Sequence, residues 1–143
     1  MALPLVEITR REEFSAAHRL HDPSLSVEAN RRLYGICNNE NGHGHNYSLE
    51  VTMRGAVAED GMVMDLNRLM VIMREAVIAE VDHKHLNLDV PFLRGVIPTA
   101  ENVAIAIWQR LEPQLQVYGA SRLHRVRLYE SRDNFVDYYG RGA

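Results

Sequence analysis

The chain is organised around Cys37-Asn-Asn-Glu-Asn-Gly-His-Gly-His-Asn-Tyr-Ser-Leu-Glu-Val-Thr-Met-Arg54. From Gly42 onward apolar and polar residues alternate, which is the pattern of a β-strand with one buried face. His43 and His45 share that face with four apolar residues, Tyr47, Leu49, Val51 and Met53. In a strand the two histidines lie about 6.6 Å apart along the chain. That spacing suits two ligands of one metal ion, although hydrogen-bonded core histidines would give the same pattern.

Other histidines and the single cysteine favour the metal, because imidazole and thiolate are the usual ligands of zinc. A catalytic zinc takes three protein ligands and keeps a fourth position for water or substrate. By composition the third ligand is one of His18, His21, His83, His85 and His124. A predicted strand over residues 5–19 ends its apolar face at His18. A ligand held by sheet geometry is better preorganised than one on a loop, which favours His18.

Three further groups are candidates for chemistry. Cys37 lies in a polar segment, where a neighbouring base or cation would make its thiolate reactive; the alternative is a small buried side chain. In Asp82-His83 the aspartate can fix the tautomer of the imidazole, or the histidine is favoured there by the C-terminal end of a helix dipole. Glu130 ends a buried row of a predicted strand, where it either pairs with an arginine or receives a ligand with two N–H groups.

The predicted order of elements is β-β-α-α-β-β. The strands cover residues 5–19, 42–54, 123–131 and 134–139, and residues 26–34 are compatible with a short helix in the excursion 21–36. Asp65 is the predicted N-cap of a helix over 66–79 and Thr99 that of a second helix, which Pro113 should end or kink near Glu112. This order favours an α+β fold, an antiparallel four-stranded sheet with both helices on one face. The uncovered face and the edges predict an oligomer.

The composition narrows the function. The 143 residues form a single domain, 1–143, and 46% hydrophobic with 24% charged residues is ordinary for a globular protein. A net charge of −3 without a basic stripe argues against nucleic acid as a partner. No apolar run reaches membrane-spanning length and no secretory leader is apparent, so a cytoplasmic location is expected.

Several fragments, taken together and in order, resemble the 6-pyruvoyl-tetrahydropterin synthase family. They are Phe14-Ser-Ala-Ala-His-Arg-Leu20, Cys37-Asn-Asn-Glu-Asn-Gly-His-Gly-His-Asn46, Gly61-Met-Val-Met-Asp-Leu66, Asp82-His-Lys84, Leu88-Asp-Val-Pro91, Thr99-Ala-Glu-Asn102 and Tyr129-Glu130. The resemblance covers about residues 7–140. It implies the tunnelling fold, in which trimers close into a barrel and two trimers stack as a hexamer with active sites at subunit interfaces.

The resemblance also implies an activity. The enzyme would be a zinc-dependent lyase that converts 7,8-dihydroneopterin triphosphate to 6-pyruvoyl-tetrahydropterin and triphosphate in tetrahydrobiopterin biosynthesis. By matching positions Zn²⁺ would be held by His18, His43 and His45. Cys37 would accept protons, with a relay from a neighbouring subunit formed by Asp82 and His83. Glu130 would anchor the pterin ring, and the pterin pocket would be lined by Thr99 and Glu101. Candidate contacts for the triphosphate are Arg10, Arg11, Arg19 and Lys84.

Two alternatives are weighed against this function. The first is 6-carboxy-5,6,7,8-tetrahydropterin synthase of queuosine biosynthesis. In that branch the cysteine typically lies four residues before the first histidine of the pair, whereas Cys37 lies six residues before His43. The second is a non-enzymatic pterin- or zinc-binding module, which the presence of Cys37, His83 and Glu130 disfavours. Departures from the family pattern at Glu40, His85 and Ala100 concern only the edge of the pocket.

Overall fold

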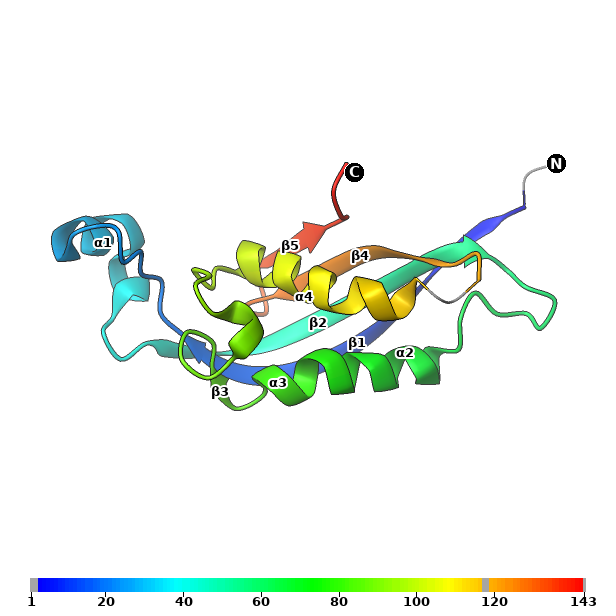
Figure 1. Ribbon diagram of the computed structural model, residues 1–143, viewed down its shortest axis with the longest axis horizontal. Helices are drawn as coiled ribbons and strands as arrows, with labels where there is room; N and C mark the ends of the chain where they lie inside the picture. Colours follow the sequence, from blue (N-terminus) through cyan, green and yellow to red (C-terminus); the bar gives the residue numbers. More distant parts are fainter. Residues whose placement is uncertain (1–2, 117–118, 143) are drawn as a thin grey trace.

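The computed structural model of the protein describes residues 3–116 and 119–142. Its centre is a five-stranded sheet with the strand order β3-β1-β2-β4-β5. The strands are β1 (Leu5–His18), β2 (His43–Ala56), β3 (Lys84–His85), β4 (Arg122–Tyr129) and β5 (Phe135–Tyr138). The predicted α+β class is confirmed, because two helical segments cover one face of this sheet (Figure 1).

The helical segments divide into two groups. The first group packs on the sheet and comprises α2 (Leu66–Met73), η2 (Arg74–Ile78), α3 (Ala79–Val81) and α4 (Ala100–Leu115). The second group lies beyond one end of the sheet (Figure 1) and comprises α1 (Val27–Tyr34) and η1 (Gly35–Asn38). A short turn, η3 (Pro91–Leu93), precedes α4. α1 begins where predicted, because the Ser26 side chain accepts a hydrogen bond from the Ala29 N–H at 3.0 Å.

The hairpin of β1 and β2 forms the frame of the fold. The two strands pair antiparallel from Leu5 opposite Ala56 to His18 opposite His43. Their inner faces bury alternate side chains, and Phe14 stacks on Tyr47 with ring centroids 4.8 Å apart. Because the register is fixed by this buried row, the histidines at both strand ends face the same side as the core.

The predicted sheet of four antiparallel strands is wrong in one respect, since a fifth strand runs parallel to β1. Lys84 and His85 pair beside Ala16 and Ala17. The pairing follows a sharp turn at His83, whose φ is 61° and whose N–H donates to the Ser15 carbonyl at 2.6 Å. A strand of two residues carries no periodic pattern, which is why sequence periodicity does not reveal it.

The helix that begins at Asp65 differs from the prediction in its interior. The Asp65 side chain accepts from Asn67 N–H at 2.8 Å, as expected for an N-cap, but residues 74–78 form a π-helix before α3 continues to Val81. A π turn displaces backbone carbonyls from their usual partners. One of them, that of Ala76, accepts a hydrogen bond from Arg110 Nε of α4 at 2.9 Å. The two helices are therefore tied together just before the Asp82-His83 pair.

Of the two predicted effects of Pro113 on the second helix, an end near Glu112 is wrong. The helix α4 continues through Pro113 to Leu115. Proline lacks the N–H that would bond to the carbonyl four residues earlier, so its place inside the helix has a cost in stability. Leu115 is fully buried and holds this last turn against the core.

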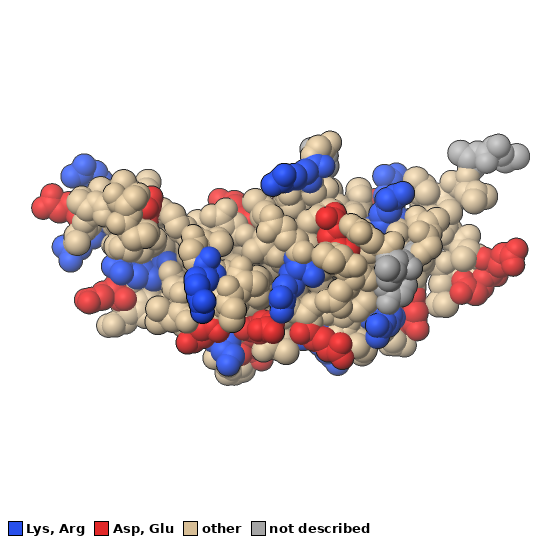
Figure 2. Space-filling view, viewed as in Figure 1, with Lys and Arg blue, Asp and Glu red and all other residues tan. Residues whose placement is uncertain are grey.

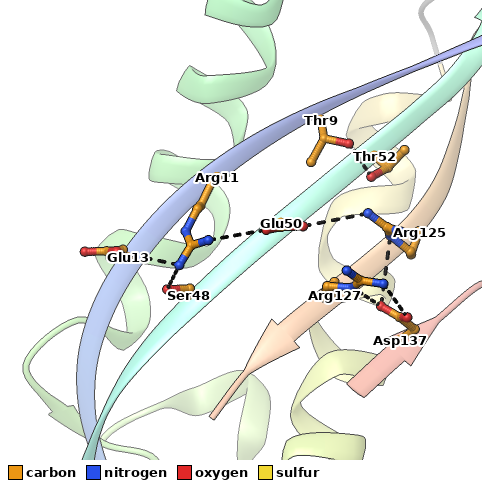
Figure 3. A network of polar contacts seen from close by, with 9 residues as sticks. All are labelled: Thr9, Arg11, Glu13, Ser48, Glu50, Thr52, Arg125, Arg127 and Asp137. Carbon is orange, nitrogen blue, oxygen red and sulfur yellow. Dashed lines mark hydrogen bonds and ion pairs between the residues drawn. The ribbon is translucent and has the colours of Figure 1, made fainter. Parts of the chain in front are cut away.

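The face of the sheet opposite the helices is polar (Figure 3). Glu50 lies between Arg11 at 3.5 Å and Arg125 at 3.7 Å. Arg127 donates to Asp137 at 2.7 Å, and this hydrogen bond raises the pKa of the guanidinium. The charges on this face are largely paired. The face therefore needs no apolar cover, unlike the opposite one.

Candidate functional site

Three histidines meet where β1 and β2 end. The register places His18 opposite His43 and Ala16 opposite His45. His18 Nε2 lies 3.1 Å from His43 Nε2, and one nitrogen from each of the three rings falls within 4.8 Å of the others. Among residues 3–116 and 119–142 this is the one group of three or more His, Cys, Asp or Glu side chains that can hold a metal ion. We call His18, His43 and His45 the metal group.

His18 is held rigidly. Its side chain is buried at 1% exposure, and its Nδ1 donates to the Pro98 carbonyl at 2.8 Å. The Tyr47 hydroxyl lies 3.3 Å from the same nitrogen. An N–H bound to a carbonyl fixes the tautomer and leaves the lone pair on Nε2, as metal-ligating histidines require. The strand thus sets the side to which His18 points, and the loop before α4 fixes the orientation of its ring.

The electrostatics of the cluster fit a cation. Burial lowers the pKa of both His18 and His45, so these rings are neutral at pH 7, the form that binds a metal. His43 Nδ1 and His45 Nε2 are buried without a hydrogen bond to any described residue. Two nitrogens on one tetrahedral zinc at about 2.0–2.1 Å would lie roughly 3.3–3.4 Å apart, close to the observed separation of His18 and His43. The three histidines therefore fit a metal ion such as zinc.

Cys37 lies outside this group. It is a free, partly buried thiol in η1, and its carbonyl accepts a hydrogen bond from Leu20 N–H at 2.9 Å. Leu20 follows two residues after His18, so this bond ties η1 to the strand end that carries the metal group. Cys37 is not among the described residues that form the metal group, so a metal held by the three histidines would keep its fourth position for water or substrate.

Asp82 and His83 are paired. His83 Nδ1 lies 3.0 Å from Asp82 Oδ1, and the same oxygen accepts from Ser15 N–H at 2.9 Å. The Ser15 N–H, together with His83, lowers the pKa of Asp82, so this carboxylate is ionised. The His83 side chain is 82% exposed. An ionised carboxylate behind an exposed imidazole supports the imidazolium form of His83 and leaves its ring accessible from outside the chain.

Glu130 reaches the metal group from β4. Its Oε1 lies 3.9 Å from His45 Nε2, and its charge opposes the loss of the proton from His18. A hollow of about 560 Å³ is lined by Glu130 and His45 together with Tyr129 and Asn46. The predicted buried carboxylate is therefore half-buried and faces a hollow beside the histidines, where it can accept two N–H groups of a ligand.

Thr99 and Glu101 lie at the start of α4. Thr99 Oγ1 accepts from Asn102 N–H at 3.2 Å and so caps the helix, while Glu101 is exposed in the first turn. The preceding residue, Pro98, supplies the carbonyl that holds His18. This connection places the start of α4 next to the metal group.

Other predicted residues are engaged elsewhere. Arg10 pairs with Glu12 at 2.9 Å, and His124 lies 3.7 Å from Glu7. Sequence patterns did not identify Tyr47 or Pro98 as partners of His18. Tyr47 shares parity with the histidines, a signal that was available, whereas Pro98 is 80 residues away in the chain and only the tertiary structure shows its contact.

The comparisons with known proteins agree with this geometry. Residues 7–141 match the model of the family described as 6-pyruvoyl tetrahydropterin synthase. A 6-pyruvoyl tetrahydrobiopterin synthase of Dictyostelium discoideum is 47% identical over 94% of this chain and 96% of its own. The solved 6-pyruvoyl tetrahydropterin synthase of Caenorhabditis elegans superposes with a TM-score of 0.90 at 40% identity, covering 98% of this chain and 99% of that one. A putative 6-carboxy-5,6,7,8-tetrahydropterin synthase of Archaeoglobus fulgidus is 37% identical over 87% of each chain.

Proposed function

Because the chain belongs to the 6-pyruvoyl tetrahydropterin synthase family, we propose that it converts 7,8-dihydroneopterin triphosphate to 6-pyruvoyl-tetrahydropterin and triphosphate in tetrahydrobiopterin biosynthesis. The observation that carries this proposal is the convergence of three histidines with Glu130 3.9 Å from one of them. One site thus combines metal ligands with an acceptor for the N–H groups of a pterin ring. Hydrogen is redistributed within the substrate, so no nicotinamide or flavin is needed.

The proposed cofactor is Zn²⁺, held by His18, His43 and His45. When bound, zinc would act as a Lewis acid towards the two side-chain hydroxyl groups of the substrate. The hydrogen bond from His18 to Pro98 keeps the metal-facing nitrogen unprotonated and oriented. Burial of Tyr47 raises the pKa of its phenol, so it stays neutral and adds no competing charge beside His18.

Cys37 is the proposed proton acceptor. A thiolate outside the metal group can remove carbon-bound protons from the substrate while the triphosphate leaves. Asp82 and His83 form the proposed relay, in which Asp82 holds His83 by its Nδ1 at 3.0 Å. Because His83 is directed to solvent in the single chain, we propose that it acts at the site of a neighbouring subunit.

Glu130 is the proposed anchor of the pterin ring, since a carboxylate accepts two N–H groups of such a ring in a forked arrangement. Thr99 and Glu101 are the proposed lining of the pterin pocket at the start of α4. The position of the preceding Pro98 against His18 supports this placement.

The oligomer is proposed to be a hexamer made of two trimers. In the part of the chain that the structure describes, β1 has a second partner only at Ala16 and Ala17, and β5 pairs only with β4. Unpaired strand edges invite pairing with another chain. Large apolar side chains are exposed near these edges, among them Leu5 at 56% and Phe135 at 46%. Trimers that join edge to edge would satisfy both edges.

Sedimentation equilibrium is expected to give six times the chain mass of 16.3 kDa. A species of one chain mass at micromolar concentration would contradict the assembly.

The described helices include none that is long and apolar enough to cross a membrane. A cytoplasmic location stays a prediction, which cell fractionation tests.

The function is tested by incubating the zinc-loaded protein with 7,8-dihydroneopterin triphosphate and identifying the pterin product by mass. We expect 6-pyruvoyl-tetrahydropterin together with one released triphosphate per turnover. Heat-denatured protein with equal zinc is the matched control. A 6-carboxy product with acetaldehyde would assign the protein to the queuosine branch, and absence of turnover would leave a non-enzymatic pterin- or zinc-binding module.

A further inference from the structure

A groove opens beyond the metal-binding end of the sheet, against α1 and η1. It has a volume of about 1040 Å³, and its polar lining includes Arg19, His21, Arg31, Asn38 and Glu40. An adjoining hollow of about 450 Å³ shares Arg19, His21 and Glu40. Figure 2 shows several basic side chains, with acidic ones among them, on the lobe that α1 and η1 form. None of these residues holds the metal or the pterin ring in the proposed site.

The groove begins one residue away from the three histidines in the chain, because Arg19 lines it. Arg19 follows the ligand His18 in the chain, and Gly42 precedes the ligand His43. The backbone is tightly packed at this point, because a Cβ on Gly42 would lie 2.9 Å from the His18 carbonyl oxygen. Cys37 is on the same lobe and is tied to Leu20 by a backbone hydrogen bond of 2.9 Å. Its chain neighbours Ile36 and Asn38 line the groove, so a ligand that extends from the metal past Cys37 can enter it.

Arg19 is preorganised in the groove. Its Nε donates to the Asn38 carbonyl at 3.1 Å, and its backbone N–H donates to Asn87 Oδ1 at 2.8 Å. The side-chain amide of Asn87 donates in return to the Arg19 carbonyl at 2.8 Å. These bonds hold Arg19 at the strand end, and none of them uses the two terminal nitrogens of its guanidinium.

The basic residues near the site differ in how far they are neutralised. Arg10 and Arg11 form ion pairs with glutamates. Arg19 and Arg31 form no ion pair with any described residue, although both line the groove. Arginine with free terminal N–H groups matches the geometry of phosphate oxygens and can bind them in a forked arrangement. Arg19 and Arg31 thus differ from Arg10 and Arg11, whose charges are already paired with glutamates.

We propose that this groove binds the triphosphate chain of the substrate, with Arg19 and Arg31 as its charged contacts. The proposal rests on the proposed function for the identity of the ligand. The substrate side chain carries its triphosphate on the carbon next to the hydroxyl groups that face the metal, so the phosphates must lie within a few bonds of it. Glu40 is the one carboxylate in the lining. It opposes a polyanion and limits the affinity of the groove.

The test compares two neighbouring arginines of α1. Arg31 lines the groove, whereas Arg32 is exposed in the same last turn of the helix and does not. Binding of inorganic tripolyphosphate to the metal-loaded full chain is measured by calorimetry, with the metal content checked afterwards. We expect Arg31→Gln to weaken binding about 10-fold, as loss of one charge-assisted hydrogen bond does, and Arg32→Gln to leave it unchanged. Glu40→Gln should strengthen it. Equal effects of the two arginine variants would overturn the proposal.

Steady-state kinetics separates this proposal from the proposed function. With 7,8-dihydroneopterin triphosphate, Arg31→Gln should raise KM about 10-fold while kcat stays within about twofold, because only binding outside the reacting atoms is lost. Turnover in which Arg31→Gln changes neither KM nor tripolyphosphate binding would reject the groove and keep the enzyme. Tripolyphosphate binding that depends on Arg31, without turnover, would reject the enzyme and keep the groove as a polyphosphate site.

Discussion

Replacement of Cys37 by alanine is expected to lower kcat by about 10²- to 10⁴-fold, the usual contribution of a positioned proton acceptor, while the protein keeps its metal. The reason is the separation of the two roles, since Cys37 is outside the group formed by the three histidines. Its side chain is partly buried in a short 3₁₀ segment, and its structural hydrogen bond uses the backbone carbonyl, which alanine retains. The measurement is kcat together with zinc per chain for the two proteins.

Cys37→Ser is the matched control for size and polarity. Its hydroxyl ionises far less readily than a thiol, whose ordinary pKa is about 8.5, so the serine variant should be nearly as slow as the alanine variant. Normal turnover in Cys37→Ala would contradict the assignment of the proton acceptor. Loss of zinc in this variant would instead make Cys37 a ligand and close the fourth metal position.

Replacement of His43 by alanine is expected to abolish metal binding and, with it, turnover. His43 Nε2 lies 3.1 Å from His18 Nε2, so its removal leaves two ligands on an ion that needs three protein ligands at a catalytic site. The loss of affinity should exceed the roughly 10- to 100-fold that changes to outer-shell partners cause. Zinc per chain after dialysis is the direct measurement, and circular dichroism reports whether the fold persists.

His124→Ala is the control for this variant. His124 lies on β4 and contacts Glu7 at 3.7 Å and the Tyr139 ring, away from the metal group. This variant should bind zinc as the unmodified protein does. Unchanged zinc stoichiometry in His43→Ala would reject the ligand set, whereas equal loss in both variants would show a general effect of unfolding.

Prediction from the sequence succeeded where a repeating pattern met a buried face. The parity of His18, His43 and His45 with the apolar rows of their strands placed all three on the core side, and the structure brings them together at one strand end. The caps at Asp65 and Thr99 gave the starts of two helices correctly, because a capping side chain acts on N–H groups within three residues.

Prediction failed where the deciding contact is distant in the chain. The π-helix at 74–78 coincides with a hydrogen bond between Ala76 and Arg110, 34 residues apart. The strand β3 exists only because His83 turns the chain onto Ser15. Helix α4 passes through Pro113 because burial of Leu115 favours the last turn over the local preference of proline.

The sequence by itself determined the α+β class, the two capped helices and the common face of the three histidines, because these depend on periodicity and on contacts within a few residues. Only the tertiary structure decided how the site is completed. Pro98 holds His18 from 80 residues away, Ser15 holds Asp82 from 67 residues away, and Asn87 holds Arg19 from 68 residues away. Such hydrogen bonds form between chain segments that meet only after the sheet and its helices have packed, so no local pattern records them.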